Sequence, residues 1–311
     1  MTSAATAPPR RRSRLEPAGG YWAYLIPGAI GFAAVVLIPF GMNIYLSLTQ
    51  YRGVGTPVFI GLDNYARLAA DPTFWASFVN SIVFIFAMAI IPTALGVFVA
   101  AVLFDFIAPR FGTRVSSIMR AMFYLPQILP IAVAGVLWKW IYQPEYGVGN
   151  SILDSIGLGA LRQNWLGDSD TAIWAVVNVL IWLQIGYTVV LFMAGLSRVD
   201  PALYEAAELD GAGWMTRFRM ITLNQLRPEI AVVIITTSVA ALKVFAPIFV
   251  LTKGGPGTST MVPSYFSFSS FFTTSQVGYG AAVATVLALV ITVIAVGLLL
   301  FQTRNTEGFE K

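Results

Sequence analysis

Six long apolar stretches constrain the fold of this chain more than any other feature. A membrane-spanning helix needs about 20 consecutive, mainly apolar residues, and the only charged residues in these stretches are Lys139 and Lys243. Strands of a membrane barrel would alternate apolar and polar residues over about 10 positions, unlike these uniform runs. We therefore predict an all-α, polytopic membrane protein with six transmembrane helices, at residues 22–48, 78–104, 121–142, 172–197, 230–251 and 277–301.

The composition agrees with a lipid environment and excludes several kinds of chemistry. Of the 311 residues, 57% are hydrophobic and 11% are charged, whereas soluble domains carry about 25% charged residues. The chain has neither Cys nor His, which excludes disulfides, thiolate metal sites and a Ser-His-Asp triad. None of its Lys residues follows a Gly, so the Gly-Lys pair of a Walker A loop is absent. We expect no catalysis, no ATP hydrolysis, and no metal or cofactor in this chain.

Basic residues divide unevenly between the two sides of the predicted membrane domain. Thirteen Lys and Arg fall on the side of both termini and of residues 198–228, and four fall on the other side. Such an excess marks the cytoplasmic side. We therefore predict a flexible cytoplasmic tail at residues 1–20, a membrane domain at 21–303 and a cytoplasmic end at 304–311. This bias explains the net charge of +4, so no nucleic-acid partner is predicted.

Residues 198–228 form a long charged loop between the fourth and fifth apolar stretches. Asp200-Pro201 is typical of a helix start, with an N-cap acid followed by Pro at the first helical position. We predict a helix over residues 201–209, a turn at Asp210-Gly211 and a second helix over residues 214–226. From the pattern alone, this hairpin could also be an amphipathic pair of helices lying on lipid.

The spacing in this loop is similar to the EAA loop of ABC-importer permeases. Glu205-Ala206-Ala207 is followed by Asp210-Gly211-Ala212, and then by Phe218, Ile221 and Pro228. Further segments resemble the carbohydrate-uptake branch, of the maltose and glycerol-phosphate type: "GLDNYARL" (61–68), Asn80-Ser81, "LWKWIYQPEYGVGN" (137–150), "FMAGLSRVDPALYEAA" (192–207) and "VLTKGGPGTST" (250–260). Asn224 stands where the family usually has Pro, so we expect the second helix of the loop to end differently here.

The resemblance implies a permease subunit that forms half of a translocation pathway in a bacterial cytoplasmic membrane. Its partners would be a second, homologous permease, two cytoplasmic ABC ATPases that bind ATP and Mg²⁺, and an extracytoplasmic solute-binding protein. The implied ATPase-coupling residues are Glu205, Ala206, Ala207, Asp210, Gly211 and Ala212. A disaccharide, glycerol 3-phosphate and a glycerophosphodiester all remain open as the solute.

Polar residues inside the apolar stretches are the candidates for contact with a solute. Sugars are bound by planar hydrogen-bonding groups together with aromatic faces. The candidates are Asn178, Trp182, Gln184, Tyr187 and Lys243. Hydrogen bonding between packed helices is the alternative for Asn178, and extension of the amine to the headgroups is the alternative for Lys243. We expect Pro247 to break the fifth helix, and Trp138 and Tyr142 to be interfacial anchors.

Two other classes of protein are alternatives to an ATP-driven importer. An ion- or proton-coupled secondary transporter usually needs buried acids or histidines as relays, and no Asp or Glu lies inside the six stretches. A non-transporting membrane scaffold would bind partners without responding to a solute.

Overall fold

The computed structural model describes residues 19–307 and divides into two units, residues 1–45 and residues 46–311. The first unit holds α1 (Gly19–Phe32), the π-helical segment η1 (Ala33–Leu37) and most of α2 (Ile38–Ser47). Its apolar side chains from Tyr24 onward are mostly exposed, which suits a helix surrounded by lipid. Most of the predicted tail, and residues 308–311 of the predicted cytoplasmic end, lie outside the described residues.

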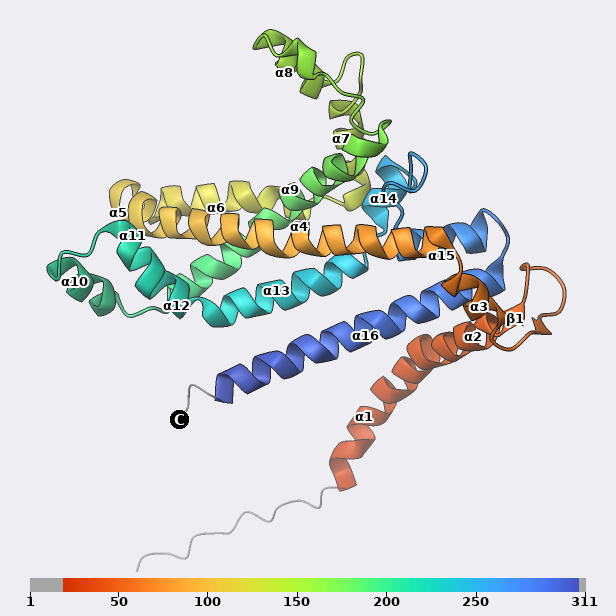
Figure 1. Ribbon diagram of the computed structural model, residues 1–311. Helices are drawn as coiled ribbons and strands as arrows, with labels where there is room; N and C mark the ends of the chain where they lie inside the picture. The colour runs from red at the N-terminus through yellow and green to blue at the C-terminus, as the bar shows by residue number, and fades with distance from the viewer. Residues whose placement is uncertain (1–18, 308–311) are drawn as a thin grey trace, which may run out of the picture. The chain divides into compact units, whose positions relative to one another are not determined.

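The second unit is almost entirely helical (Figure 1). Its first part contains the antiparallel hairpin β1 (Thr49–Gln50) and β2 (Val58–Phe59), then α3 (Asp63–Ala69), α4 (Pro72–Val102), η2 (Leu103–Ile107), α5 (Ala108–Phe111), α6 (Thr113–Ile128) and α7 (Ile131–Ile141). Its second part contains α8 (Val148–Ser155), η3 (Gly159–Leu161), α9 (Ser169–Leu196), α10 (Pro201–Leu209), α11 (Trp214–Arg217), η4 (Phe218–Thr222), α12 (Leu223–Gln225), α13 (Arg227–Leu242), α14 (Ala246–Leu251), α15 (Pro263–Phe272) and α16 (Val277–Glu307).

The core of the second unit forms where α4 packs along α9, with α13 against α4 and α6 against α9. Glycines allow these helices to approach closely. A Cβ at Gly96 of α4 would lie 2.1 Å from Thr188 Oγ1, and one at Gly186 of α9 would lie 2.2 Å from the Phe123 carbonyl oxygen of α6. Thr188 Oγ1 donates to the Pro92 carbonyl at 2.9 Å. Small residues and interhelical hydrogen bonds of this kind hold helices together in lipid.

Four of the predicted stretches correspond to helices that are apolar and long enough to cross a membrane without a break. Within the described residues these helices cover Tyr24–Ser47, Pro72–Phe111, Ser169–Leu196 and Val277–Leu300. Counting each of two bent helix pairs as one span would raise the number to six. The helix that contains the second stretch is longer than predicted at both ends.

The third predicted stretch is not one helix, because α6 and α7 meet at an angle of 95°. Leu129 has φ −66° and ψ 133°, an extended conformation. It precedes Pro130, whose ring disfavours the helical conformation in the residue before it. The helix before the break also begins earlier than predicted, at Thr113.

The fifth predicted stretch is interrupted between α13 and α14. Pro247 lies in the first turn of α14, and a proline ring clashes with the carbonyl four residues earlier, which here belongs to Lys243. α13 accordingly ends at Leu242, with Lys243 as its C-cap residue. The prediction of a break at Pro247 is confirmed, with the unwound residues just before the proline. Ser264 Oγ donates to the carbonyl of Val244 at the break.

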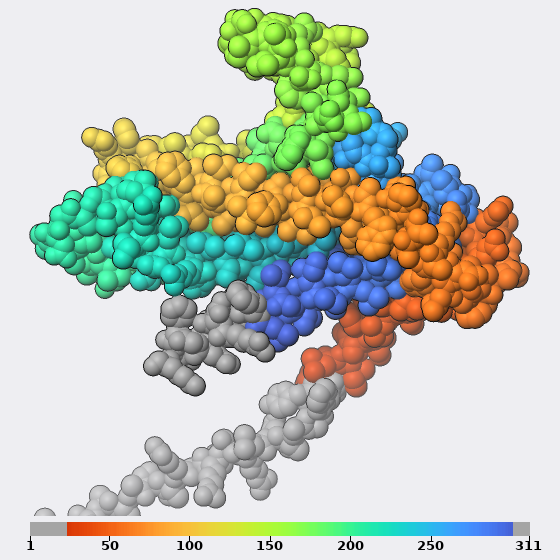
Figure 2. Space-filling model, in the orientation of Figure 1, coloured from red at the N-terminus to blue at the C-terminus, as the bar shows by residue number. Residues whose placement is uncertain are grey.

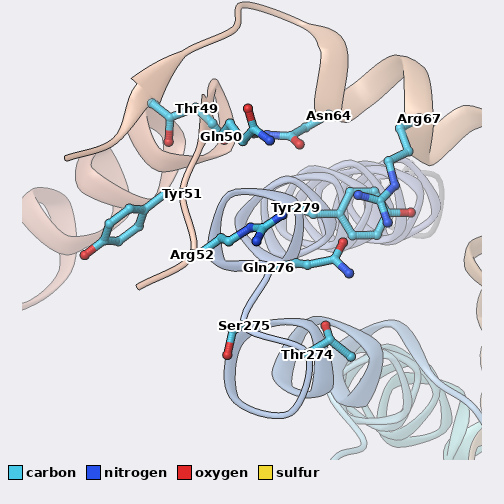
Figure 3. Close-up of a pocket in the computed structure, with 10 residues that line it drawn as sticks. All are labelled: Thr49, Gln50, Tyr51, Arg52, Asn64, Arg67, Thr274, Ser275, Gln276 and Tyr279. Carbon is cyan, nitrogen blue, oxygen red and sulfur yellow. Dashed lines mark hydrogen bonds between the residues drawn. The ribbon is translucent and has the colours of Figure 1, made fainter. Parts of the chain in front are cut away.

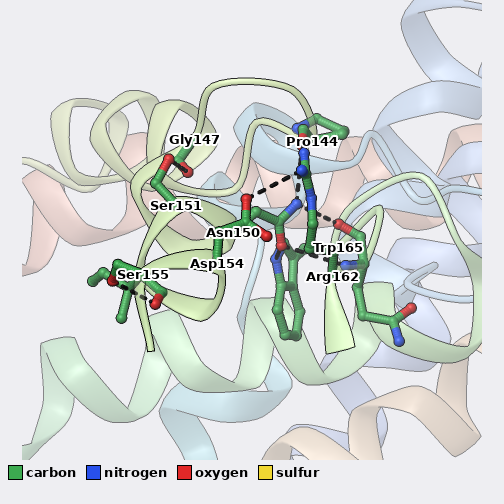
Figure 4. A network of polar contacts seen from close by, with 10 residues as sticks. Pro144, Gly147, Asn150, Ser151, Asp154, Ser155, Arg162 and Trp165 are labelled. Atoms are coloured by element: carbon green, nitrogen blue, oxygen red, sulfur yellow. Dashed lines mark hydrogen bonds and ion pairs between the residues drawn. The ribbon is translucent and has the colours of Figure 1, made fainter. Parts of the chain in front are cut away.

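Residues 143–168, between α7 and α9, form a small structure around Asn150 (Figure 4). The Asn150 amide nitrogen donates to the carbonyls of Pro144 and Gln163, both at 3.0 Å, and Trp165 Nε1 donates to Asn150 Oδ1 at 2.9 Å. Arg162 forms an ion pair with Asp154 at 3.1 Å. The buried Asn150 side chain thus donates through its amide nitrogen and accepts through its amide oxygen, and these hydrogen bonds fix the path of the loop.

Candidate functional site

Residues 198–228 fold into the predicted pair of helices. Asp200 Oδ1 accepts a hydrogen bond from the Ala202 backbone N–H at 3.0 Å, and Pro201 follows as the first residue of α10. The helix ends at Leu209, and helical structure begins again at Trp214. The predicted N-cap and both helices of the loop are therefore confirmed.

The turn between the two helices depends on the backbone of Gly211. The Gly211 N–H donates to the Glu208 carbonyl at 3.0 Å, and the Ala212 N–H donates to the Ala207 carbonyl at 2.9 Å. This pair of bonds is a Schellman motif, which needs a left-handed residue after the helix. Gly211 has φ +77°, and a Cβ there would meet no atom within 4 Å. The backbone angle, rather than a lack of space, therefore requires glycine.

The six predicted coupling residues lie around this turn on an open surface. Glu205, Ala206, Asp210 and Gly211 are exposed, and Ala207 and Ala212 are partly exposed. The neighbouring Leu209 is 90% exposed. Within residues 19–307, neither Glu205 nor Asp210 takes part in an ion pair. The surface thus combines two free carboxylates, short side chains and an exposed leucine. Figure 2 shows residues 198–228 (teal) as one compact knob at an end of the second unit.

The second helix of the loop is fastened to the end of α4 and to η2, the helical segment that follows it. Trp214 Nε1 donates to Asp105 Oδ2 at 2.8 Å. The Trp214 ring also contacts Phe98 of α4, Phe106 of η2 and Phe218 of its own segment, at centroid distances of 6.2, 5.4 and 5.3 Å. A hydrogen bond within an aromatic cluster makes a stiff attachment.

Two further contacts tie α10 to the second helical part of the loop, and a third joins the residues after α9 to α13. Arg217 pairs with Glu208 at 2.8 Å, Tyr204 Oη and Thr222 Oγ1 lie 3.0 Å apart, and Arg198 pairs with Glu229. Burial raises the pKa of the Tyr204 hydroxyl, which the Thr222 hydrogen bond only partly offsets, so this side chain stays neutral. These contacts connect the loop to α4 and η2, to the end of α9 and to α13.

The structure brings some of the predicted solute-path residues together and separates others. The Asn178 amide donates to Tyr142 Oη at 2.8 Å, and Tyr142 Oη donates to the Ala175 carbonyl at 3.2 Å. Trp182, one turn further along α9, meets Trp138 edge to face at 5.5 Å. Asn178 and Trp182 thus share one polar and aromatic group with the end of α7.

Gln184 and Tyr187 lie on other faces of α9, since 3.6 residues complete a helical turn. Tyr187 packs against the second buried cluster, around Phe192 and Leu226. Lys243 is exposed at the break after α13, and the next two residues, Val244 and Phe245, pack with Trp182 in the first buried cluster. The five candidates therefore do not form one site, and Asn178, Trp182 and Lys243 remain around the same cluster.

Comparison with known proteins identifies the family. Residues 110–305 match the profile of the "Binding-protein-dependent transport system inner membrane component". The chain belongs to this family. It is similar to the probable ABC transporter permease protein YurN of Bacillus subtilis (strain 168), with 36% identity over 86% of this chain and 90% of the relative. It is also similar to the diacetylchitobiose uptake system permease protein NgcF of Streptomyces coelicolor, with 34% identity over 97% of this chain and 87% of the relative.

The fold of this permease is also that of a solved structure. A crystal structure of a bacterial ABC transporter involved in the import of the acidic polysaccharide alginate contains a similar chain, with a TM-score of 0.79, 22% identity, and 92% of this chain and 96% of that one covered. The prediction of an all-α permease subunit of an ABC importer is confirmed. The chain is a non-catalytic, multi-pass component of the inner membrane.

Two of the sequence segments that carried the resemblance meet in this permease. Asn80, near the start of α4, donates its amide to the carbonyls of Thr258 and Met261 at 3.0 and 2.9 Å. The Gly-rich segment 253–260 is therefore held against α4 as a tight turn, which Thr260 Oγ1 also closes on the Gly255 carbonyl at 2.9 Å. The Asn80–Thr258 hydrogen bond thus connects residues that are 178 positions apart in the chain.

Sequence reasoning missed three residues of these sites. Asp105 follows directly after the predicted second span, and only its isolation in the apolar segment "LFDFI" indicated a role. Trp138 and Tyr142 were expected to be interfacial anchors, but Tyr142 is 7% exposed, and both pack in the first buried cluster. The expectation was wrong for Tyr142, because its hydroxyl is bonded to Ala175 and Asn178 of α9.

Proposed function

We propose that residues 198–228 are the coupling element through which two cytoplasmic ATPase subunits drive this permease. The single observation that carries the proposal is an exposed surface combined with a firm attachment: Glu205 and Asp210 are exposed and form no ion pair within residues 19–307, and Trp214 is bonded to Asp105 of η2, directly after α4. A partner that binds the surface and moves would pull on α4, α9 and α13 together. The loop lying flat on lipid is the alternative, which the free carboxylates of Glu205 and Asp210 disfavour.

We further propose that the solute is a carbohydrate and that a second, homologous permease completes the path. One relative, NgcF, which is 34% identical to this chain, is named for diacetylchitobiose uptake. In this chain, Asn178 and Trp182 supply an amide and an aromatic face, the groups that recognise sugars. The apolar side chains of α16 that remain exposed, among them Val293 at 70%, offer a face to lipid or to a second permease. An extracytoplasmic binding protein would deliver the solute.

The test compares two glycines that lie two residues apart. Gly211 has φ +77°, whereas Gly213 has φ −64°, and both have open space around them. Gly211→Val should distort the turn, whereas Gly213→Val keeps an ordinary backbone. The permease, with its partner subunits, is purified from membranes through a tag on this chain. We expect Gly211→Val to abolish ATP-dependent uptake of labelled disaccharides, and to lower the amount of ATPase that copurifies, at an unchanged level of permease in the membrane.

Charge reversal gives a second comparison within the same assay. Glu205→Lys should also abolish uptake and lower the amount of copurified ATPase, because Glu205 is exposed, forms no ion pair within residues 19–307 and is available to a partner. Arg114→Glu reverses a charge on an exposed residue outside the loop and should leave copurification unchanged. Normal uptake by both Gly211→Val and Glu205→Lys would show that the loop is not the coupling element.

A further inference from the structure

A polar pocket lies beside α3 and the start of α16 (Figure 3), at the end of the second unit far from the coupling loop (Figure 1). It has a volume of about 450 Å³, and its lining comes from the segment after α2, from α3, and from the start of α16 with the turn before it. The lining includes Arg52 and Arg67 but no Asp or Glu. A pocket that contains two guanidinium groups and no carboxylate is suited to an anion.

The positive charge of this pocket is not neutralised within the described part of the chain. The ion pairs among residues 19–307 lie elsewhere, and neither arginine takes part in them. Arg67 lies over the ring of Tyr279, 4.2 Å from its centroid, and in Figure 3 the Arg52 side chain also extends toward Tyr279. The nearby carboxylate of Asp71 accepts hydrogen bonds from Tyr279 Oη at 2.6 Å and from the Thr73 N–H. Asp71 is thus engaged, and it is not part of the lining.

Gln276 supplies a second, independent indication of a ligand. It lines the pocket, and its Oε1 atom is buried without a hydrogen-bond partner. A buried acceptor without a donor is costly, and a ligand with a hydroxyl group would satisfy it. The pocket therefore calls for a molecule that carries both a negative charge and a hydroxyl donor.

The position of the pocket along the chain indicates where such a molecule comes from. The first candidate span ends at Ser47, and the last begins at Val277. The pocket residues 49–52 and 274–279 lie directly at these two ends. They are therefore level with the boundary between hydrocarbon and water, where the phosphates of a bilayer lie.

We propose that this pocket binds the headgroup of an anionic glycerophospholipid, with its phosphate on Arg52 and Arg67 and a headgroup hydroxyl donating to Gln276. The leaflet is the one opposite to the coupling loop. Phosphatidylglycerol has both required groups, whereas phosphatidylcholine lacks the net charge and the hydroxyl. The bound lipid would hold the start of α16 against the β1–β2 hairpin and α3, independently of the solute that the permease carries.

The experiment uses the full-length chain in nanodiscs of equal parts phosphatidylglycerol and phosphatidylcholine. After transfer to detergent, the lipid that remains bound is counted by native mass spectrometry. The wild type should retain phosphatidylglycerol, and Arg52→Gln and Arg67→Gln should each retain about tenfold less, the effect of losing a charged hydrogen bond. Arg162→Gln is the matched control, because Arg162 is also predicted to face outward but pairs with Asp154. It should retain as much as the wild type.

Two further arms distinguish the lipid from other anions. In nanodiscs of equal parts phosphatidylglycerol and phosphatidic acid, the wild type should retain more phosphatidylglycerol, because phosphatidic acid has the phosphate without the glycerol hydroxyls. Gln276→Leu should lose this preference. Inorganic phosphate at millimolar concentration should not displace the lipid.

Equal retention of phosphatidylglycerol by Arg52→Gln and the wild type would overturn the proposal. Displacement of the lipid by phosphate would also overturn it and would indicate a site for a free anion. Loss of association with the solute-binding protein in Arg52→Gln, with lipid retention unchanged, would also overturn it and indicate a protein contact. Arg52 is exposed, so its substitution leaves the core intact.

Discussion

Asn178 and Trp182 lie one turn apart on α9, and Asn178 makes a polar contact whereas Trp182 makes an aromatic one. Asn178 is exposed and its amide reaches Tyr142, so Asn178→Ala leaves the core intact. If the amide holds a sugar hydroxyl, its loss should raise the KM for uptake about tenfold, the usual effect of one lost hydrogen bond to a ligand. The measurement is the concentration dependence of labelled-disaccharide uptake by proteoliposomes of the full transporter.

Tyr187→Phe serves as the control at this scale, because Tyr187 packs in the other buried cluster. It should leave KM unchanged. An unaltered KM for Asn178→Ala would return Asn178 to its alternative role, a hydrogen bond between packed helices. A change in the maximal uptake rate with no change in KM would also assign Asn178 to helix packing, because the loss of a solute-binding group should change KM.

Residues of the coupling site differed in how far the sequence could predict them. The N-cap at Asp200 and the turn at Gly211 follow local rules, which involve only neighbouring residues, and both were predicted correctly. The Asp105–Trp214 bond joins residues that are 109 positions apart, and no local rule relates them. The same holds for the Asn178–Tyr142 bond. A local pattern predicts the shape of a hairpin, whereas the surface on which it rests depends on the packing of distant helices.

At the scale of the helices, Gly186 indicates how closely α6 and α9 must approach. A Cβ at this position would lie 2.2 Å from the Phe123 carbonyl oxygen and 2.6 Å from Tyr124 Cα. These are backbone atoms, so the helices themselves would have to separate. We expect Gly186→Ala to lower the stability of the purified permease by about 1–3 kcal/mol, as overpacking usually does, and thermal unfolding in detergent measures the change.

Gly297 of α16 provides the comparison, because a Cβ there would meet nothing within 4 Å. Gly297→Ala should be neutral or slightly stabilising, since Ala has the higher helix propensity. Equal unfolding temperatures for the two variants would contradict the close packing of α6 and α9.

Unbroken helices were easier to predict than broken ones, for a physical reason. Hydropathy measures the transfer of side chains into lipid and identifies any apolar stretch that is long enough. It contains no information about backbone direction, so the 95° bend between α6 and α7 lies inside a stretch that looks uniform. Proline chemistry supplies that information in part, and it located the break before Pro247. At Leu129-Pro130 the same rule applied, but the prediction followed hydropathy instead.

At the scale of the whole molecule, the coupling surface and the Asn150 loop should lie on opposite sides of the membrane. They are separated by one helix, α9, whose 28 residues span about 42 Å at 1.5 Å each, more than the hydrocarbon thickness. The distribution of thirteen and four basic residues predicts that this helix is oriented with the coupling loop in the cytoplasm. Without that orientation, cytoplasmic ATPases could not reach Glu205.

The absence of cysteine from the chain makes this orientation directly measurable. Leu209→Cys places a single thiol on a residue that is 90% exposed, and Ser155→Cys places one on the exposed end of α8. In intact cells, a membrane-impermeant maleimide should label Ser155→Cys only, and Leu209→Cys should react after the membrane is opened. Prior assembly with the ATPases should then slow the labelling of Leu209→Cys. Labelling of Leu209→Cys from outside, or of both thiols from the same side, would contradict the predicted topology and with it the proposed coupling.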